Sequence, residues 1–391
     1  MDNLYNEEKA NECKTDLELR VYTSNLLGQN SELVLHGGGN TSVKSKINNE
    51  EILLVKGSGW DLVSIKKEGF AAVKLDALLV MAKLERLTDI EMVKGQREAM
   101  IDDNAPNPSV EAILHALIPY KFVDHTHADA IVTISSAVTG KENIKKLFPN
   151  FLIVDYVMPG FILAHEIYKK TKDLDWSSID GIILHNHGIF TFDNDAKKSY
   201  DKMINAVSSA EVFLDANAVI DIEHKYMHSD CNILKIVKKL SDAKGYDVAI
   251  SINQTPLAAF YASQENLKEF ASRGVLTPEH IIRTKRVPLI MEDTDLEKGL
   301  IEYMDAYQAY FDEFAVNKVA LNAAPNYMII KNLAVISFGK TREAAVIVND
   351  IVDHTMLAVL RADKLGGYQS ISLKDSFDME YWDLEQAKLK K

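Results

Sequence analysis

The 391 residues suggest two domains or one large one, and an apolar content of 47% is enough for a sizeable buried core. The net charge of −13 gives no global basic signature for nucleic acid, and no apolar run is long enough to span a membrane. Because Cys13 and Cys231 are the only cysteines, we infer no disulfide framework and expect a reducing, cytoplasmic setting.

The first part of the chain alternates predicted helices and strands with glycine-rich loops. Apolar spacing predicts a helix over 15–29, and "ELVL" is typical of a strand that enters the loop "HGGGNTS". A second strand, 52–55, enters a "KGSG" loop, and the stretch 71–87 looks helical. Pro108 and Ser109 are expected to open an amphipathic helix, which the short strand "FVDHTH" follows.

A strand-turn-strand-helix unit occurs twice in the rest of the chain. The segment 182–216 aligns without gaps with 328–362, and Leu333 stands where the first copy has His187. Two interpretations remain open: an internal repeat whose second copy has lost its site residues, or a shared hydrophobic pattern only. A polar linker between the two units is expected near 222–245. Interleaved strands and helices predict an α/β or α+β class.

Three histidines form a pattern that is typical of a metal site. His125 and His127 are two residues apart, so on a strand both side chains point to the same face. His187 ends an apolar strand, and His185 competes with it as a third ligand. Three imidazoles suit Zn²⁺ or a similar first-row metal; the alternative is a set of hydrogen-bonded structural histidines. We interpret the isolated histidines as structural: His36, His115 and His165.

Glu111 lies just inside the helix that "NPS" opens. A carboxylate in a first helical turn is favoured by the helix dipole, which is the simplest explanation. Beside a three-histidine metal site, Glu111 becomes a candidate general base or fourth ligand.

The region 245–391 holds one compact basic cluster, formed by Arg283, Lys285 and Arg286. We interpret it as a solvated surface that pairs with the acidic rest of the molecule. The alternative is a contribution to substrate or subunit binding.

Five motifs occur in the order found in the class II sugar-phosphate aldolases of the aldolase/adducin family: "GGGNTSVK", "VKGSGW", "PSVEAILH", "VDHTHAD" and "LHNHG". The resemblance covers roughly residues 15–220. It implies an α/β/α sandwich around a central, mainly antiparallel sheet, with a catalytic domain over 1–225 and a C-terminal α/β extension over 226–391. It also implies a homo-oligomer, by family resemblance a tetramer.

The family's site residues fall on particular positions of this sequence. Its three zinc-binding histidines fall on His125, His127 and His187, and its catalytic glutamate falls on Glu111. The positions that hold the substrate phosphate in the family correspond to Gly39, Asn40, Ser58, Gly59 and Ser109.

The sequence departs from the family at one phosphate donor, because Val110 stands where the family has a second serine. Lys56 can supply a compensating charge, and Lys44 is a poorer candidate. The long motifs resemble one branch in particular, the aldolase half of bifunctional rhamnulose-1-phosphate aldolase/lactaldehyde dehydrogenase proteins. The chain holds no GxGxxG dinucleotide loop, so the resemblance covers only that half.

The resemblance implies cleavage of a ketose 1-phosphate, with L-rhamnulose 1-phosphate as the best guess, to dihydroxyacetone phosphate and L-lactaldehyde. In such a reaction a divalent metal, Zn²⁺ or a similar ion, stabilises the enediolate while Glu111 acts as acid and base. The alternatives are a pentulose-phosphate 4-epimerase or a sugar-phosphate dehydratase on the same metal site, or a metal-free adducin-like binding module. The tyrosine that protonates the aldehyde oxygen in the family is not assigned by any motif.

Overall fold

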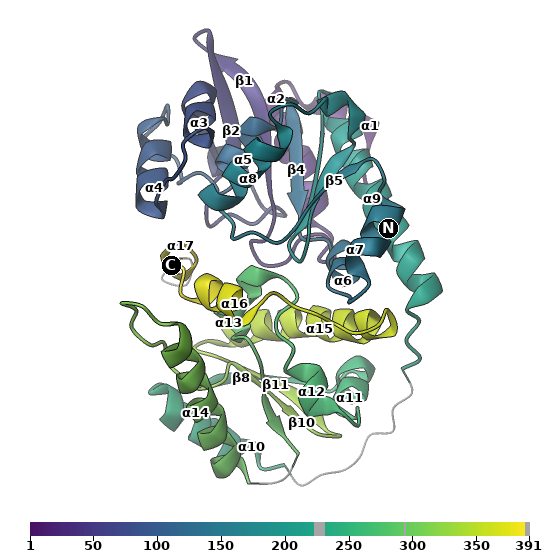
Figure 1. Ribbon diagram of the computed structural model, residues 1–391, viewed down its shortest axis with the longest axis vertical. Coiled ribbons are helices and arrows are strands. Elements are labelled where there is room, and N and C mark those ends of the chain that lie inside the picture. Colours follow the sequence, from purple (N-terminus) through teal and green to yellow (C-terminus); the bar gives the residue numbers. More distant parts are fainter. Residues whose placement is uncertain (223–230, 293–294, 388–391) are drawn as a thin grey trace. The chain divides into compact units, whose positions relative to one another are not determined.

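The computed structural model describes residues 1–222, 231–292 and 295–387, which form two compact units (Figure 1). Unit 1 comprises Met1–Ser135 and Lys141–Leu214, and unit 2 comprises Ser136–Gly140 and Asp215–Lys391. The predicted boundary between residues 225 and 226 lies outside the described residues. No helix in the described part of the chain is long and apolar enough to cross a membrane.

Unit 1 is built on a sheet whose described strands follow the order β3-β2-β1-β4-β7-β6-β5. Neighbouring strands are antiparallel except β5 and β6, which are parallel. The mainly antiparallel sheet implied by the family resemblance is therefore confirmed. The strands are β1 (Asn40–Ile47), β2 (Glu50–Lys56), β3 (Phe70–Lys74), β4 (Phe122–Thr126), β5 (Phe151–Val154), β6 (Gly181–Leu184) and β7 (Gly188–Asp193).

Helices cover both faces of this sheet (Figure 1). On one face α2 and α9 both bond to Asp124 of β4, and on the other face α3 and α5 pack against β2. The described helices of unit 1 are α1 (Glu7–Glu12), α2 (Asp16–Gly28), α3 (Leu75–Ala82), α4 (Asp89–Glu98), α5 (Ala112–Leu117), α6 (Asp129–Ser135), α7 (Gly140–Leu147), α8 (Phe161–Thr171) and α9 (Ala196–Asn217).

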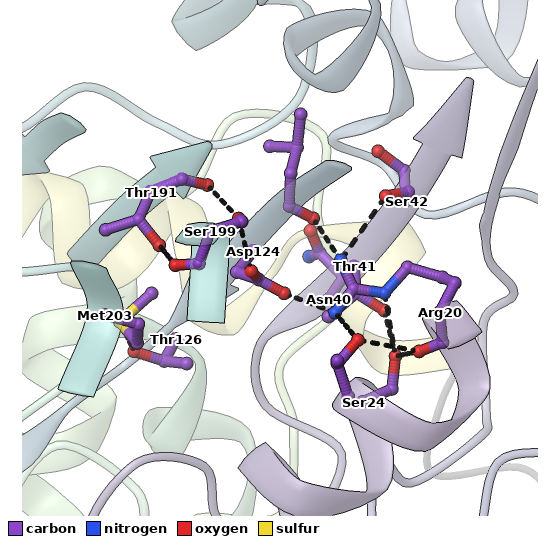
Figure 2. Close-up of polar contacts among 12 residues, drawn as sticks. Arg20, Ser24, Asn40, Thr41, Ser42, Asp124, Thr126, Thr191, Ser199 and Met203 are labelled. Carbon is purple, nitrogen blue, oxygen red and sulfur yellow. Dashed lines mark hydrogen bonds and ion pairs between the residues drawn. The ribbon is translucent and has the colours of Figure 1, made fainter. Parts of the chain in front are cut away.

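A fully buried ion pair joins α2 to the centre of the sheet. The guanidinium of Arg20 donates to the carboxylate of Asp124, and both side chains are 0% exposed (Figure 2). Arg20 also donates to the hydroxyls of Thr23 and Ser24, and Ser199 of α9 donates to the second carboxylate oxygen of Asp124. These hydrogen bonds offset the desolvation cost of burying the two charges, because each charged group left without a partner would cost several kcal/mol of stability.

Unit 2 repeats part of this topology. Its described strands follow the order β8-β11-β10-β9, and β9 pairs in parallel with β10, as β5 does with β6. The strands are β8 (Ala249–Asn253), β9 (Leu289–Met291), β10 (Tyr327–Ile330) and β11 (Ala334–Gly339). The helices are α10 (Ile233–Lys244), α11 (Pro256–Ala262), α12 (Leu267–Ala271), α13 (Ile281–Thr284), α14 (Leu296–Phe314), α15 (Arg342–Lys364), α16 (Leu373–Glu380) and α17 (Asp383–Gln386).

The two strand-turn-strand units match in detail. The strands β6 and β7 fall on β10 and β11 under the gapless alignment, and α9 and α15 begin at aligned residues. Asn186 and Asn332 occupy aligned turn positions, with positive φ angles of 57° and 61°. A shared hydrophobic pattern does not require the same left-handed residue in the same turn, so these features favour the internal repeat.

Three expectations for individual segments are wrong. The predicted "ELVL" strand is a turn, in which the amides of Leu33 and Val34 both donate to the carbonyl of Asn30. The first residues of the predicted 71–87 helix belong to β3, because pairing with β2 outweighs local propensity. Residues 223–230 of the predicted linker lie outside the described residues, and the part that follows contains α10, which ends at Lys244 before the left-handed Gly245.

The basic cluster of unit 2 is not a solvated surface. Lys285 is only 6% exposed, its ammonium lies 3.5 Å from the carboxylate of Glu380, and it sits 3.7 Å from the ring centroid of Tyr307. Burial lowers the pKa of Lys285 and raises that of Glu380. The pair thus belongs to the interior of unit 2.

We expect Arg20→Met to lower the free energy of unfolding of unit 1 by about 3–5 kcal/mol, because it leaves Asp124 buried and unpaired. Lys46→Met is the matched control, since its ion pair with Glu51 is exposed and worth about 0–1 kcal/mol. Chemical denaturation followed by circular dichroism measures both. Equal, small losses in the two variants would contradict the importance of the buried pair.

Candidate functional site

Three histidines of unit 1 converge on one point. His125 lies on β4, His127 follows the end of that strand, and His187 lies in the turn between β6 and β7. One ring nitrogen of each lies within 4.8 Å of those of the other two. His185 is not part of this group, and its Nδ1 is hydrogen-bonded to the side-chain oxygen of Asn186. Geometry therefore favours His187 over His185 as the third member.

The ring of His125 is oriented by the neighbouring strand. Its Nδ1 lies 3.0 Å from the carbonyl oxygen of Ile189, which only accepts, so Nδ1 carries the hydrogen and Nε2 is the nitrogen that can act as a ligand. This carbonyl contact is the arrangement that usually orients metal-binding histidines. The Nε2 atoms of His125 and His127 are 3.0 Å apart. Two ligands at ~2.0–2.1 Å from a tetrahedral Zn²⁺ are separated by roughly 3.3 Å, so this pair is spaced for such an ion.

Glu111 lies beside the three histidines. Its carboxylate oxygens are 3.4 Å from Nε2 of His125 and 3.7 Å from Nε2 of His187, and the residue is only 4% exposed. It is the N-cap residue of α5 and so lies just before the helix, not inside its first turn as expected. One carboxylate oxygen accepts a hydrogen bond from Asn40, and the other has no hydrogen-bond partner.

The loops that contain the predicted phosphate-binding residues lie together. The amide of Ser58 donates to the carbonyl of Asn107 at 2.8 Å, and the amide of Ser109 donates to the carbonyl of Lys56 at 3.0 Å. The ammonium of Lys56 in turn donates to the carbonyl of Gly37 at 3.3 Å, which joins the first glycine loop to the other two. Gly59, beside Ser58, has a positive φ of 88°. The structure thus brings the predicted residues into one region.

The first glycine loop also abuts the histidines. Gly39 has a positive φ of 63°, and a Cβ there would lie 2.7 Å from the carbonyl oxygen of His125. The next residue, Asn40, stands directly opposite His125 in the pairing of β1 with β4. Glycine at this position is therefore required both by conformation and by the close approach of the two backbones.

Comparison with known proteins decides the family. The pattern that describes the Class II Aldolase and Adducin N-terminal domain matches residues 18–214. The chain belongs to this family. Residues 229–389 match a second pattern, described as Aldolase class II, second domain.

Two relatives of this class II aldolase family member show how far the likeness extends. A protein of Bacillus subtilis (strain 168) named uncharacterized oxidoreductase YuxG is 29% identical over 422 residues, which cover 99% of this chain and 60% of the relative. The chain therefore spans 60% of the length of that curated relative. The solved N-terminal class II aldolase domain of a conserved Thermoplasma acidophilum protein is 40% identical with a TM-score of 0.50, covering 55% of this chain and 99% of that one.

One residue close to the site was not anticipated. His115 is not isolated: its Nε2 is hydrogen-bonded to the side-chain oxygen of Asn40, whose amide nitrogen donates to Glu111. The available signal was its spacing, because a residue four positions after Glu111 lies on the same side of a helix. His165 bonds to the carbonyl of Ala82, in keeping with a structural role, and His36 is exposed.

We expect His187→Ala to lower bound divalent metal severely, because it removes one of the three converging imidazoles. His185→Ala is the matched control: it removes a buried histidine two residues away that points elsewhere, so its metal content should equal that of the wild type. Elemental analysis of purified protein gives both values. Unchanged metal in His187→Ala, or equal losses in the two variants, would contradict the ligand assignment.

Proposed function

We propose that this protein is a metal-dependent aldolase that cleaves a ketose 1-phosphate to dihydroxyacetone phosphate and a hydroxyaldehyde. The observation that carries the proposal is the buried carboxylate of Glu111 within 3.4–3.7 Å of two of three converging histidines. L-Rhamnulose 1-phosphate, which would give L-lactaldehyde, is the substrate we favour from the long sequence motifs.

Each residue has a distinct part in this proposal. His125, His127 and His187 would hold a divalent metal, preferably Zn²⁺, which supplies Lewis-acid stabilisation of the charge that cleavage leaves on the ketose fragment. Glu111 would deliver a proton to the carbon from which the aldehyde departs, and would remove it in the reverse condensation. The unpartnered carboxylate oxygen of Glu111 supports this role, because it is available to a bound substrate.

The phosphate group would bind where the three loops meet. Backbone amides of the glycine loops and the hydroxyls of Ser58 and Ser109 suit an anion without any nucleotide motif. Lys56 is only 5% exposed and its ammonium has a protein acceptor in Gly37, so it can add a fixed positive charge. Anchoring the phosphate orients the reacting carbons, which is how remote binding energy promotes cleavage.

Other activities on the same residues give different products. An epimerase would convert one pentulose phosphate into its isomer without releasing dihydroxyacetone phosphate, and a dehydratase would release water. A metal-free adducin-like module would need neither the histidines nor a buried carboxylate beside them. The geometry of Glu111 and the three histidines therefore supports a metal-dependent enzyme over the binding module, and the products separate the aldolase from the epimerase and the dehydratase.

We expect Glu111→Gln to keep the metal and the fold but to reduce kcat by about 10²–10⁴-fold, because the amide cannot transfer the proton. The assay measures dihydroxyacetone phosphate released from a panel of ketose 1-phosphates by metal-loaded protein. Wild-type protein that releases none from any of them would contradict the proposed function. Full activity in Glu111→Gln would remove Glu111 from the mechanism.

We expect Lys56→Met to raise KM for the phosphorylated ketose about tenfold or more with a small change in kcat, because one charged hydrogen bond to the phosphate is lost. The unphosphorylated ketose is the internal control, since its kcat/KM should be nearly the same in both proteins. Thermal unfolding checks the fold of the variant. A loss that is equal for both substrates would show that Lys56 does not serve the phosphate.

A further inference from the structure

We propose that His115 is a positioning residue that, through Asn40, aims the carboxylate of Glu111 at the reacting carbon. The proposal rests on the proposed function, because it assigns a role at the same site. It concerns a chain of three hydrogen bonds that starts at Ser42, passes through His115 and Asn40, and ends on Glu111.

The chain exists because β1 presents alternate residues to α5. Thr41 and Val43 face the other way, where the hydroxyl of Thr41 is bonded to Ser24 of α2. Asn40, Ser42 and Lys44 share the face toward α5, and each contacts that helix or its N-cap residue. Strand alternation therefore places three polar side chains in a row along one short helix.

Lys44 fixes the end of this helix. Its ammonium donates to the carbonyls of His115 at 3.0 Å and Tyr120 at 2.9 Å, and also to that of Ile118. Cations are favourable near helix C-termini, where carbonyls lack partners within the helix. Two residues of β1 thus hold His115: Lys44 bonds to its backbone, and Ser42 bonds to its side chain.

The carboxylate of Glu111, at the end of the chain, determines which atom donates in the bonds that lead to it. A carboxylate only accepts, so the amide nitrogen of Asn40 must donate to Glu111, at 2.7 Å. The side-chain oxygen of Asn40 therefore faces His115 and must accept from Nε2 of that ring. Burial holds the pKa of His115 well below its usual value, so the ring is neutral and its Nδ1 accepts from the hydroxyl of Ser42 at 2.8 Å.

These bond directions restrict the rotation of the Glu111 carboxylate. Because His115 occupies the oxygen of Asn40, the amide cannot turn over, and its N–H remains on one carboxylate oxygen of Glu111. The other oxygen, which has no hydrogen-bond partner, is then held toward His187 at 3.7 Å. Without His115 the amide of Asn40 would be free to rotate, and with it the carboxylate.

Paired variants of His115 test the proposal. Glutamine can place an N–H near the position of Nε2, whereas methionine has the same length and no donor. We expect His115→Met to lower kcat about 10–100-fold, as for other residues that orient a site from outside it, with little change in KM or metal content. His115→Gln should restore most of that kcat, and Ser42→Ala should cause a smaller loss than His115→Met.

His165→Met is the control for loss of a buried histidine. His165 bonds to the carbonyl of Ala82 and lies outside the chain, so its loss should affect stability and leave kcat unchanged. A direct measurement is histidine ¹⁵N NMR of the wild-type protein, with the His115 signals assigned by their absence in His115→Gln. The hydrogen should be found on Nε2 and not on Nδ1.

Several results would overturn the proposal. They are a wild-type kcat in His115→Met, equal kcat losses in the methionine and glutamine variants, or a hydrogen on Nδ1. If His115→Met does not fold, the wild-type NMR measurement decides, because a hydrogen on Nδ1 would by itself overturn the proposal. Absence of cleavage by the wild type would instead remove the proposed function, while the NMR measurement would still decide the bond direction.

Discussion

The buried pair of Arg20 and Asp124 sets the orientation of the strand that carries His125 and leads into His127. Asp124 immediately precedes His125, and side chains alternate along β4, so fixing one to the α2 face fixes the other to the opposite face. A slip of one residue would place an imidazole against the guanidinium of Arg20 and remove Glu111 from reach of His125. Because removing either partner would leave a buried charge, the pair penalises that slip strongly.

The two units show that the scaffold can exist without the site. The strand order β8-β11-β10-β9 of unit 2 corresponds to β4-β7-β6-β5 of unit 1. Strand register places Ile252 and Gln254 at the positions of His125 and His127, and the gapless alignment places Leu333 at that of His187. Two of these three residues cannot bind a metal at all. Unit 2 keeps the left-handed asparagine of the turn, Asn332, because the reversal of the chain between β10 and β11 requires it whether or not a metal site is present.

Much of the site could be predicted where it depends on local periodicity. His125 and His127 follow from strand alternation, and the aldolase/adducin family follows from the order of five motifs. What could not be predicted depends on tertiary contacts. The link of His115 to Asn40 requires β1 and α5 to lie side by side, and the segment that became β3 needed β2 as a partner before its strand could form. Apolar residues alone do not distinguish a strand from a turn, as Leu33 shows.

The two buried carboxylates Asp124 and Glu111 of unit 1 differ in how completely they are hydrogen-bonded. Asp124 has partners for both carboxylate oxygens, whereas Glu111 has one oxygen with a donor and one without. An unsatisfied buried acceptor costs about 1–3 kcal/mol, so it persists only where something else requires it. Beside that oxygen, at 3.7 Å, lies Nε2 of His187. A cation or a proton held between the carboxylate and the imidazoles would be favourable here, and the proposed chain of bonds from His115 keeps the carboxylate turned toward them.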